Sequence, residues 1–344
     1  MTLKDIAELA ETSVSTVSRS LNDSPLISVS TKDRIKALAQ QHGFQFNAIA
    51  RGLATNTVGT IGVILPEHYD RFDVLMYHAA LHSDLRRSIE QADLDILVAF
   101  HENRFSGLDN IQRLVNRGKV DGLILVRSSL DQTTQEFLQN RKVPFVLTHY
   151  PPAQIDAEQK NTAPRVDAVW SDNREGGRMV ASHLKRRGIT SVALLTGGHD
   201  QESKLRLEGF QSELTAELVI PCNWEIETAT DAIMQYSNQI RHVEAIFAFN
   251  DLMAFGALQG LNSLGMRVPE DLLLVGYDDT PLSAATIPGI TSVHQPHEEI
   301  ARVACELLLE QIHVGTNGMD QAHTPRTISL PPYLVERSST EKNR

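Results

Sequence analysis

Between positions 60 and 277, apolar residues recur in short runs of the length expected for buried β-strands. These runs are Thr60–Leu65, Asp95–Phe100, Gly122–Val126, Pro144–Thr148, Ala168–Ser171, Val192–Thr196, Ala245–Phe249 and Leu272–Tyr277. Amphipathic segments with helical spacing, such as Leu75–Gln91 and Gly176–Arg187, separate several of them. Because strand and helix alternate, the pattern predicts parallel sheets built from βαβ units. We expect two α/β lobes that divide near Pro151–Pro164, and an exposed polar tail at Ser338–Arg344.

The first 58 residues contain no strand-like run and show helical spacing instead. Thr2 is a good N-cap, and Asp5 is placed like the acid of a capping box. After a break at Glu11 and Thr12, Ser13 can cap a second helix. Apolar residues at helical spacing are expected to pack these helices together, namely Ile6, Leu9, Ala10, Val17 and Leu21, while Val14 shares this spacing but lies at the exposed start of the second helix. Two short helices joined by a tight turn predict a helix-turn-helix.

A third helix is expected over Thr31–His42, with Ser30 as its N-cap and Gly43 at its end. In a helix-turn-helix the second helix enters the major groove and reads base edges. Its outward face here carries short polar groups and one guanidinium, namely Ser15, Ser18, Arg19 and Asn22. The pattern alone fits a packing or partner-binding module equally well, so it leaves DNA binding open.

The net charge of −11 argues at first against a polyanionic partner. The charge is uneven, however. Residues 1–58 carry six basic and five acidic residues, a net charge of +1, and the remainder carries 26 basic and 38 acidic residues, a net charge of −12. The split indicates a small N-terminal module on a larger acidic body.

The segment Asn47–Thr55 combines an N-cap with helix formers but spans only about two turns. Gly52 costs such a helix roughly 1 kcal/mol relative to alanine. The segment would therefore form a helix only when something else orders it, and a simple linker is the alternative.

Two cysteines, Cys222 and Cys305, are too few for a disulfide scaffold and fit a reducing compartment. No apolar stretch approaches the length of a transmembrane helix, and the N-terminus lacks the pattern of a secretory signal. We therefore expect a protein of the cytoplasm with no membrane partner.

Several motifs follow one another along nearly the whole chain. They are Thr2-Leu3-Lys4-Asp5-Ile6-Ala7, Thr16-Val17-Ser18-Arg19 with Leu21-Asn22, Asn47 with Ala50-Arg51-Gly52-Leu53, Ile61-Gly62-Val63, Val120-Asp121-Gly122-Leu123-Ile124, Asn250-Asp251, Val275-Gly276-Tyr277-Asp278-Asp279 and Leu330-Pro331. In this order they resemble the lactose-repressor/galactose-repressor (LacI/GalR) family. The resemblance implies an all-α helix-turn-helix headpiece over 1–58, with a hinge helix at about 47–55, and an effector-binding and dimerisation body over 59–344. The body would resemble periplasmic sugar-binding proteins, with an N-lobe at about 59–161 and 292–320 and a C-lobe at about 162–291 and 321–338.

The resemblance also implies which headpiece residues contact DNA. Val14, Ser15 and Arg19 match base-reading positions, and Arg19 could bond guanine O6 and N7. Phosphate contacts would come from Thr16, Ser18, Asn22, Thr31 and Asn47. The hinge helix would place Ala50 and Leu53 at the minor groove, where Leu53 would wedge between base steps. Glu11 departs from the family, because many members have glycine in this turn; a positive φ there would strain it.

Ligands of parallel α/β sheets bind beyond the carboxyl ends of the strands. Arg206, Asn250 and Asp278 lie at such ends and match family positions that grip the effector. His149, Phe72 and Tyr69 are further candidates, His149 as a polar contact and the other two for ring stacking. Other residues have structural interpretations: Asp251 and Asp279 as helix caps or interface residues, and Trp170 and Trp224 as core or cleft-wall residues.

The sequence gives little support for a metal site, a phosphate-binding loop or a catalytic site. The pairs His78/His82 and His294/His297 are interpreted as solvated surface histidines, because no zincin pattern or cysteine cluster accompanies them. No P-loop lysine follows Thr196–Asp200, and no catalytic set is assembled, so neither a metal, nor a cofactor, nor an enzymatic activity is expected.

The resulting hypothesis is a ligand-responsive repressor that binds a palindromic operator as a homodimer. The resemblance implies a dimer because family tetramers carry a leucine-heptad tail and this chain ends soon after Arg337-Ser338. A sugar or sugar phosphate is the favoured effector, with a nucleoside or purine second. A free solute-binding protein and an enzyme are the rival interpretations.

Overall fold

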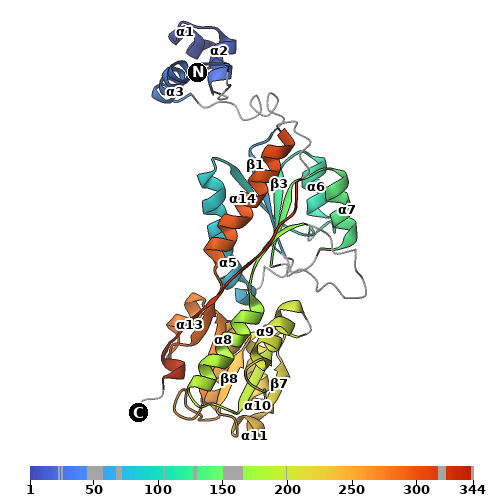
Figure 1. Cartoon of the computed structure of the whole chain (residues 1–344), viewed down its shortest axis with the longest axis vertical. Helices are drawn as coiled ribbons and strands as arrows, with labels where there is room; N and C mark the ends of the chain where they lie inside the picture. The colour runs from blue at the N-terminus through green and yellow to red at the C-terminus, as the bar shows by residue number, and fades with distance from the viewer. Residues whose placement is uncertain are drawn as a thin grey trace.

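The computed structural model describes residues 1–21, 24, 26–44, 57–66, 72–103, 105–126, 130–149, 166–198, 200–316 and 323–341. Three helices come first in the chain (Figure 1), and they are α1 (Leu3–Leu9), α2 (Val14–Leu21) and α3 (Val29–Gln41). Their small core consists of Ile6, Ala7, Ala10, Val17 and Ile35. The helix-turn-helix expected from the sequence is therefore formed.

Side-chain caps set the ends of these helices. Asp5 N donates to Thr2 Oγ1 at 3.3 Å and Thr2 N donates to Asp5 Oδ2 at 2.7 Å, which confirms the capping box. Thr16 N donates to Ser13 Oγ at 3.1 Å, which confirms the second cap.

Two sequence predictions for the headpiece are wrong. The N-cap of α3 is Ser28 and not Ser30, because Ser28 has extended backbone and accepts from Thr31 N, so the helix begins two residues earlier. Leu9, expected to pack against the other helices, is 48% exposed.

The first sheet of the body has six strands in the order β11-β5-β4-β3-β1-β2, and neighbouring strands are parallel throughout. The strands are β1 (Thr60–Leu65), β2 (Asp95–Phe100), β3 (Gly122–Val126), β4 (Phe145–Thr148), β5 (Asp167–Ser171) and β11 (Thr327–Leu330). Helices cover both faces (Figure 1). On one face lie α5 (Phe72–Gln91) and α14 (His297–Thr316), and on the other α6 (Asn110–Asn116) and α7 (Gln132–Asn140).

The second sheet also has six strands, in the order β12-β10-β9-β8-β6-β7, with β12 antiparallel to β10. Its strands are β6 (Val192–Thr196), β7 (Leu218–Pro221), β8 (Ala245–Ala248), β9 (Leu273–Asp278), β10 (Thr291–His294) and β12 (Tyr333–Val335). The helices of this lobe are α8 (Asn173–Arg186), α9 (Gln201–Gln211), α10 (Ile226–Gln235), α11 (Ser237–Ile240), α12 (Asp251–Ser263), α13 (Pro281–Ala285) and the 3₁₀ turn η2 (Ser338–Thr340). Side chains from both faces of this sheet form one continuous apolar core.

The chain passes between the two sheets three times, and this changes the lobe limits expected from the sequence. Strands β5 and β11 belong to the first sheet, although both were expected in the C-lobe, and β10 belongs to the second sheet through His294. The polar tail is also partly buried: Ser339 and Thr340 are 0% and 2% exposed, and Ser339 Oγ donates to the Leu274 carbonyl at 2.5 Å. Within the described residues, no helix has the length and apolarity needed to span a membrane.

Candidate DNA-binding face and effector site

The second helix presents the predicted base-reading side chains to solvent. Val14, Ser15 and Arg19 are exposed, while Thr16 and Ser18 are half-buried. Val14 keeps 44% of its surface exposed although it is apolar, which is the state a thymine-contacting side chain needs before DNA is bound.

The turn before α2 is held in an unusual conformation. Glu11 has φ +48°, in the left-handed region where a non-glycine residue is strained. Arg34 of α3 donates to the Ala10 carbonyl at 3.1 Å, so a hydrogen bond from the third helix holds this turn in place. Thr31, a predicted phosphate contact, is half-buried in the first turn of α3 and bonds Ser28 Oγ at 2.7 Å through its hydroxyl.

Several predicted site residues lie outside the described residues, namely Asn22, Asn47, Ala50, Leu53 and Tyr69. Phe72 is the first residue of α5, and its side chain also lies outside the described part of the chain. Their roles stay predictions.

Arg206 of α9 is the centre of a buried polar cluster at the carboxyl ends of the strands. It is 4% exposed; its Nε donates to Asn173 Oδ1 at 2.8 Å, and a terminal nitrogen donates to the Phe249 carbonyl. The other terminal nitrogen lies 4.0 Å from Asp278 Oδ1. These contacts join α9 to the start of α8 and to the ends of β8 and β9. They therefore fix the orientation of the Arg206 guanidinium.

Two aromatic rings flank the Arg206 guanidinium. It lies 3.6 Å from the Tyr277 ring centroid and 5.3 Å from the Trp224 ring. Trp224 is in turn held by its Nε1, which donates to Asp200 Oδ2 at 2.9 Å. Trp224 therefore faces the cluster, as the cleft-wall interpretation expected, while Trp170 is 8% exposed in the core of the first lobe.

Asp278 is the acidic member of the cluster. Gln295 Nε2 donates to its Oδ1 at 2.7 Å, and its backbone has φ +102°. Burial raises the pKa of Asp278 to about 6, although Arg206 and Gln295 act to lower it. The carboxylate can therefore change charge close to neutral pH.

Asn250 is tied to local structure. Its Oδ1 accepts from Met253 N at 2.7 Å as the N-cap of α12, and its Nδ2 donates to the Trp224 carbonyl at 3.2 Å. Each amide atom retains further capacity, so Asn250 holds the Trp224 loop while its ligand role stays a prediction.

Asp251 was expected to cap a helix or face a subunit, and this is wrong. It is fully buried and accepts hydrogen bonds from Thr280 N at 2.6 Å and from Ser292 Oγ at 2.6 Å. Burial raises its pKa to about 7, with Asp278 nearby adding to the increase.

His149 follows β4 and lies beside His78 of α5, with ring centroids 5.8 Å apart. Burial lowers the pKa of His149 to about 3 and that of His78 to about 4, so both rings are neutral at pH 7. The interpretation of His78 and His82 as solvated surface residues is therefore wrong, because both are half-buried.

Sequence reasoning missed two hydroxyls beside Arg206. Tyr277 Oη and Ser171 Oγ are buried, and neither makes a hydrogen bond to a third group within the described part of the chain. The Ser171 hydroxyl lies close enough to the Tyr277 hydroxyl to lower its pKa, although burial raises that pKa to about 12. Tyr277 ends the predicted strand run Leu272–Tyr277, and only its position at the strand end could have marked it.

Two family profiles match this chain. Residues 2–47 match bacterial regulatory proteins of the lacI family, and residues 181–340 match a periplasmic binding protein-like domain. Together they place a lacI-type headpiece and a periplasmic-binding-like body in one chain. The chain therefore carries a headpiece of the lacI family of bacterial regulatory proteins.

Curated relatives of this chain are named as repressors. The HTH-type transcriptional repressor PurR of Aliivibrio fischeri (strain ATCC 700601 / ES114) is 29% identical over 350 residues, with 98% of each chain covered. PurR of Vibrio cholerae serotype O1 (strain M66-2) is 27% identical over 349 residues, with 99% of this chain and 98% of the relative covered. A lacI-type headpiece and a periplasmic binding protein-like domain are thus present in a chain whose relatives are named as transcriptional repressors, and none of these relatives is named as an enzyme.

Solved structures of this family share the fold. The lac repressor dimer bound to operator and the anti-inducer ONPF superposes with a TM-score of 0.73 at 23% identity over 99% of both chains. The complex of the transcriptional regulator CelR with cellobiose gives a TM-score of 0.69 at 24% identity, covering 98% of this chain and 99% of CelR. A ribose-bound LacI family regulator from Enterococcus faecium gives 0.66 at 22% identity, covering 83% of this chain and all of the other.

Proposed function

We propose that this repressor binds a palindromic operator as a homodimer and that a small molecule bound between its lobes alters its affinity for DNA. One observation carries the proposal. A solvent-exposed base-reading face, with Val14, Ser15 and Arg19, occurs in the same chain as a preorganised buried cluster around Arg206. A repressor of bacterial operators acts where the DNA is, in the cytoplasm.

The dimer is supported by apolar side chains left at the edge of the first sheet. Val98 and Phe100 on the edge strand β2 are each 41% exposed, and Leu108 and Phe105 nearby in sequence are 58% and 95% exposed. Exposed apolar groups gathered in one region mark protein interfaces, and a second copy of the chain would cover them.

The effector site would combine donors and acceptors with flat apolar faces. Arg206 and Asp278 supply a donor and an acceptor, and the buried hydroxyls of Tyr277 and Ser171, which face each other, retain further hydrogen-bonding capacity. A sugar or sugar phosphate offers hydroxyls to all four groups, and the solved neighbours with cellobiose and ribose fit this class. A nucleoside or purine is the second candidate, because Trp224 and the His78–His149 pair offer rings for stacking.

Binding at this site can regulate DNA only through a difference in affinity between two arrangements of the lobes. Arg206 and Tyr277 belong to the second lobe, and Ser171 ends a strand of the first. A ligand that bonds both sets of groups would stabilise one arrangement of the lobes. That change would alter the spacing of the two 47–55 segments and hence operator affinity.

The DNA-binding part is tested by titrating the full-length protein with operator-like and random duplexes at several salt concentrations. We expect specific, salt-dependent binding that is lost when residues 1–58 are deleted. Equal binding of the same DNA by the deletion variant would refute the repressor function and favour a solute-binding protein.

The effector part is tested by a thermal-shift ligand screen, followed by DNA titration with and without the ligands found. Arg206→Ala should abolish the ligand response and leave operator binding intact, because Arg206 lies in the body. Arg241→Ala, an exposed arginine of the same lobe, is the matched control. Loss of DNA binding in folded Arg206→Ala protein would contradict this division of roles.

A further inference from the structure

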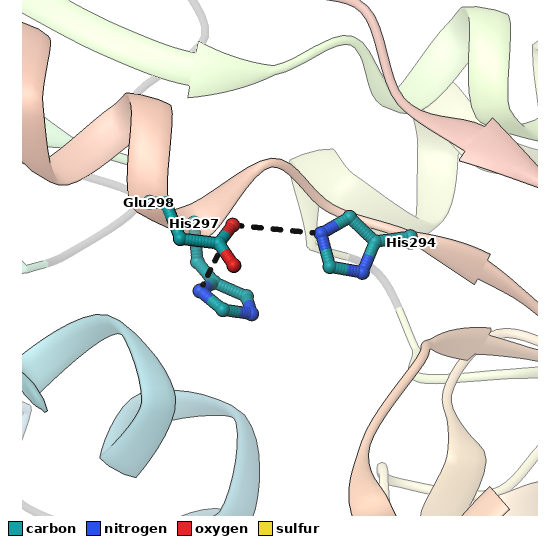
Figure 2. A group of neighbouring side chains, drawn as sticks. All are labelled: His294, His297 and Glu298. Carbon is teal, nitrogen blue, oxygen red and sulfur yellow. Dashed lines mark ion pairs between the residues drawn. The ribbon is translucent and has the colours of Figure 1, made fainter. Parts of the chain in front are cut away.

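A cluster of His294, His297 and Glu298 lies where the chain passes from the second lobe back to the first (Figure 2). His294 ends β10 and is 8% exposed, while His297 and Glu298 begin α14. The expectation that His294 and His297 are solvated surface histidines is therefore wrong for His294, and His297 is half-buried. We propose that these three residues form a binding site for a divalent transition-metal ion, best fitted by Zn²⁺.

Carboxylates hold both imidazole rings in place. His294 Nδ1 lies 2.9 Å from Asp279 Oδ2, and Asp279 is itself held by Arg337 at 2.5 Å. His297 Nδ1 lies 2.7 Å from Asp84 Oδ2 on α5, and Arg87 holds that carboxylate at 2.9 Å. Metal-binding histidines characteristically give their second nitrogen to a carboxylate, which orients the ring and raises its basicity, and His294 has this arrangement because its Nε2 faces Glu298. In His297 the same Nδ1 faces both Asp84 and Glu298, so an ion bound there would replace the hydrogen bond to Asp84.

The Glu298 carboxylate lies between the two rings (Figure 2). Its Oε2 is 3.7 Å from His294 Nε2 and 3.5 Å from His297 Nδ1, and one ligand atom from each residue can be chosen within 4.8 Å of the others. Bonds of about 2.0–2.2 Å in a tetrahedral zinc site place neighbouring ligand atoms roughly 3.3–3.5 Å apart. Small side-chain rotations would therefore bring the cluster to ligand geometry.

The donor set selects the class of metal. Two imidazoles and one carboxylate suit Zn²⁺ and its transition-metal neighbours, whereas Ca²⁺ and Mg²⁺ prefer oxygen ligands. Three protein ligands leave a coordination position for water. The carboxylates of Asp84, Asp279 and Glu298 make the surroundings favourable for a cation, although Arg87 and Arg337 offset part of this charge.

The site bridges the two lobes. His294 belongs to the second sheet, while α14 and α5 pack on the first. Gln295, between the metal-binding residues, donates to Asp278 of the Arg206 cluster. A bound ion would fix this passage between the lobes without contacting the Arg206 cluster.

The test uses the full-length chain without a histidine tag, freed of metal with EDTA, and titrated with ZnCl₂ by calorimetry and with CoCl₂ by visible absorption. We expect one saturable ion per chain and the d–d bands of bound Co²⁺. Glu298→Gln and His294→Gln should each weaken binding at least about tenfold. His313→Gln, an exposed histidine of the same helix α14, should bind as the parent does.

The side chain of Glu298 is 58% exposed, so the Glu298→Gln protein should keep the fold. If His294→Gln does not fold, the zinc affinity of Glu298→Gln alone tests the proposal. Absence of saturable binding, or unchanged affinity in Glu298→Gln, would overturn the proposal. An equal loss in His313→Gln would do the same, because it would show that zinc binds elsewhere on α14.

Discussion

Asp278 shows how the environment of one residue can link ligand binding to pH. Its side chain has two possible charge states near neutrality, because burial raises its pKa to about 6 while Arg206 and Gln295 favour the ionised form. An effector hydroxyl that donates to the carboxylate would favour that form further. Proton binding and effector binding would then compete at the same atom.

Effector affinity should fall as the pH is lowered from about 7 to 5, through the pKa of Asp278. Asp278→Asn should lower affinity at pH 7.5 by about 1.5–3 kcal/mol, the usual loss for a hydrogen bond to a charged group, and should flatten the pH dependence. Asparagine tolerates the positive φ of this position. Calorimetric titration with the effector at several pH values measures both effects.

The same substitution has a defined effect on stability. Because the folded pKa of Asp278 exceeds the unfolded value, the parent loses stability as the pH rises from about 4 to 6, and Asp278→Asn removes that loss. Asp231→Asn, at an exposed aspartate, is the control. An unchanged pH profile of effector binding in Asp278→Asn would show that another group governs it.

At the scale of elements, the turn between α1 and α2 is strained by its sequence. Left-handed backbone at a non-glycine residue costs roughly 1–2 kcal/mol, and Glu11 is held there at φ +48°. The turn also points the start of α2, with Val14 and Ser15, away from the headpiece core.

Glu11→Gly should stabilise the headpiece by up to about 1 kcal/mol, because the strain removed exceeds the flexibility that glycine adds to the unfolded chain. Hydrogen exchange of the α1 amides in the full-length protein measures the opening free energy. Glu8→Gly, at an exposed site within α1, should instead destabilise the helix by about 1 kcal/mol. If the opening free energy of α1 changed in the same direction in both variants, strain at Glu11 would be ruled out.

The contact between α8 and α9 positions Arg206 and depends on small residues. A Cβ on Gly177 of α8 would lie 2.1 Å from the carbonyl oxygen of Arg206 in α9, and a Cβ on Gly209 would lie 1.8 Å from the Arg174 carbonyl oxygen. The two backbones therefore approach closely only because these positions lack side chains.

Gly177→Ala should separate the two helices, lower the free energy of unfolding of this lobe by roughly 1–3 kcal/mol and weaken effector binding together with it. Urea unfolding and effector titration measure the two effects. Lys185→Ala, at an exposed position of α8, should change neither appreciably. Wild-type effector affinity in Gly177→Ala would mean that Arg206 does not depend on this packing.

At the scale of the whole molecule, a headpiece of net charge +1 cannot rely on bulk electrostatics for DNA affinity. The remaining affinity for DNA would have to come from dimerisation and from ordering of the 47–55 segment on DNA. The effector would act on this second contribution, since its proposed site lies in the body.

Leu53→Ala should weaken operator binding more than random-DNA binding, because a minor-groove wedge contributes only where the duplex is kinked. Electrophoretic titration at one salt concentration gives the ratio of parent to Leu53→Ala affinity on the operator duplex and on the random duplex. Equal losses on both duplexes would argue against a wedge.

The periodicity of the sequence determined the elements, because caps, turns and strand runs depend on residues close together in the chain. The capping box at Thr2 and Asp5 and eight strands, β1 to β6 with β8 and β9, were predictable for this reason, whereas β7 was not predicted. The resemblance added Arg206 and Asp278, residue by residue.

Only the tertiary structure decided which elements meet. A strand buried on both faces, such as β5 or β10, fits either sheet, and β11 is a short edge strand with partly exposed side chains, so the sequence could not assign these three strands to their lobes. Contacts between residues far apart in sequence also placed Tyr277 against Arg206 and Asp84 against His297, and buried Thr340 beside His183. Such contacts depend on three-dimensional packing, and no local pattern records them.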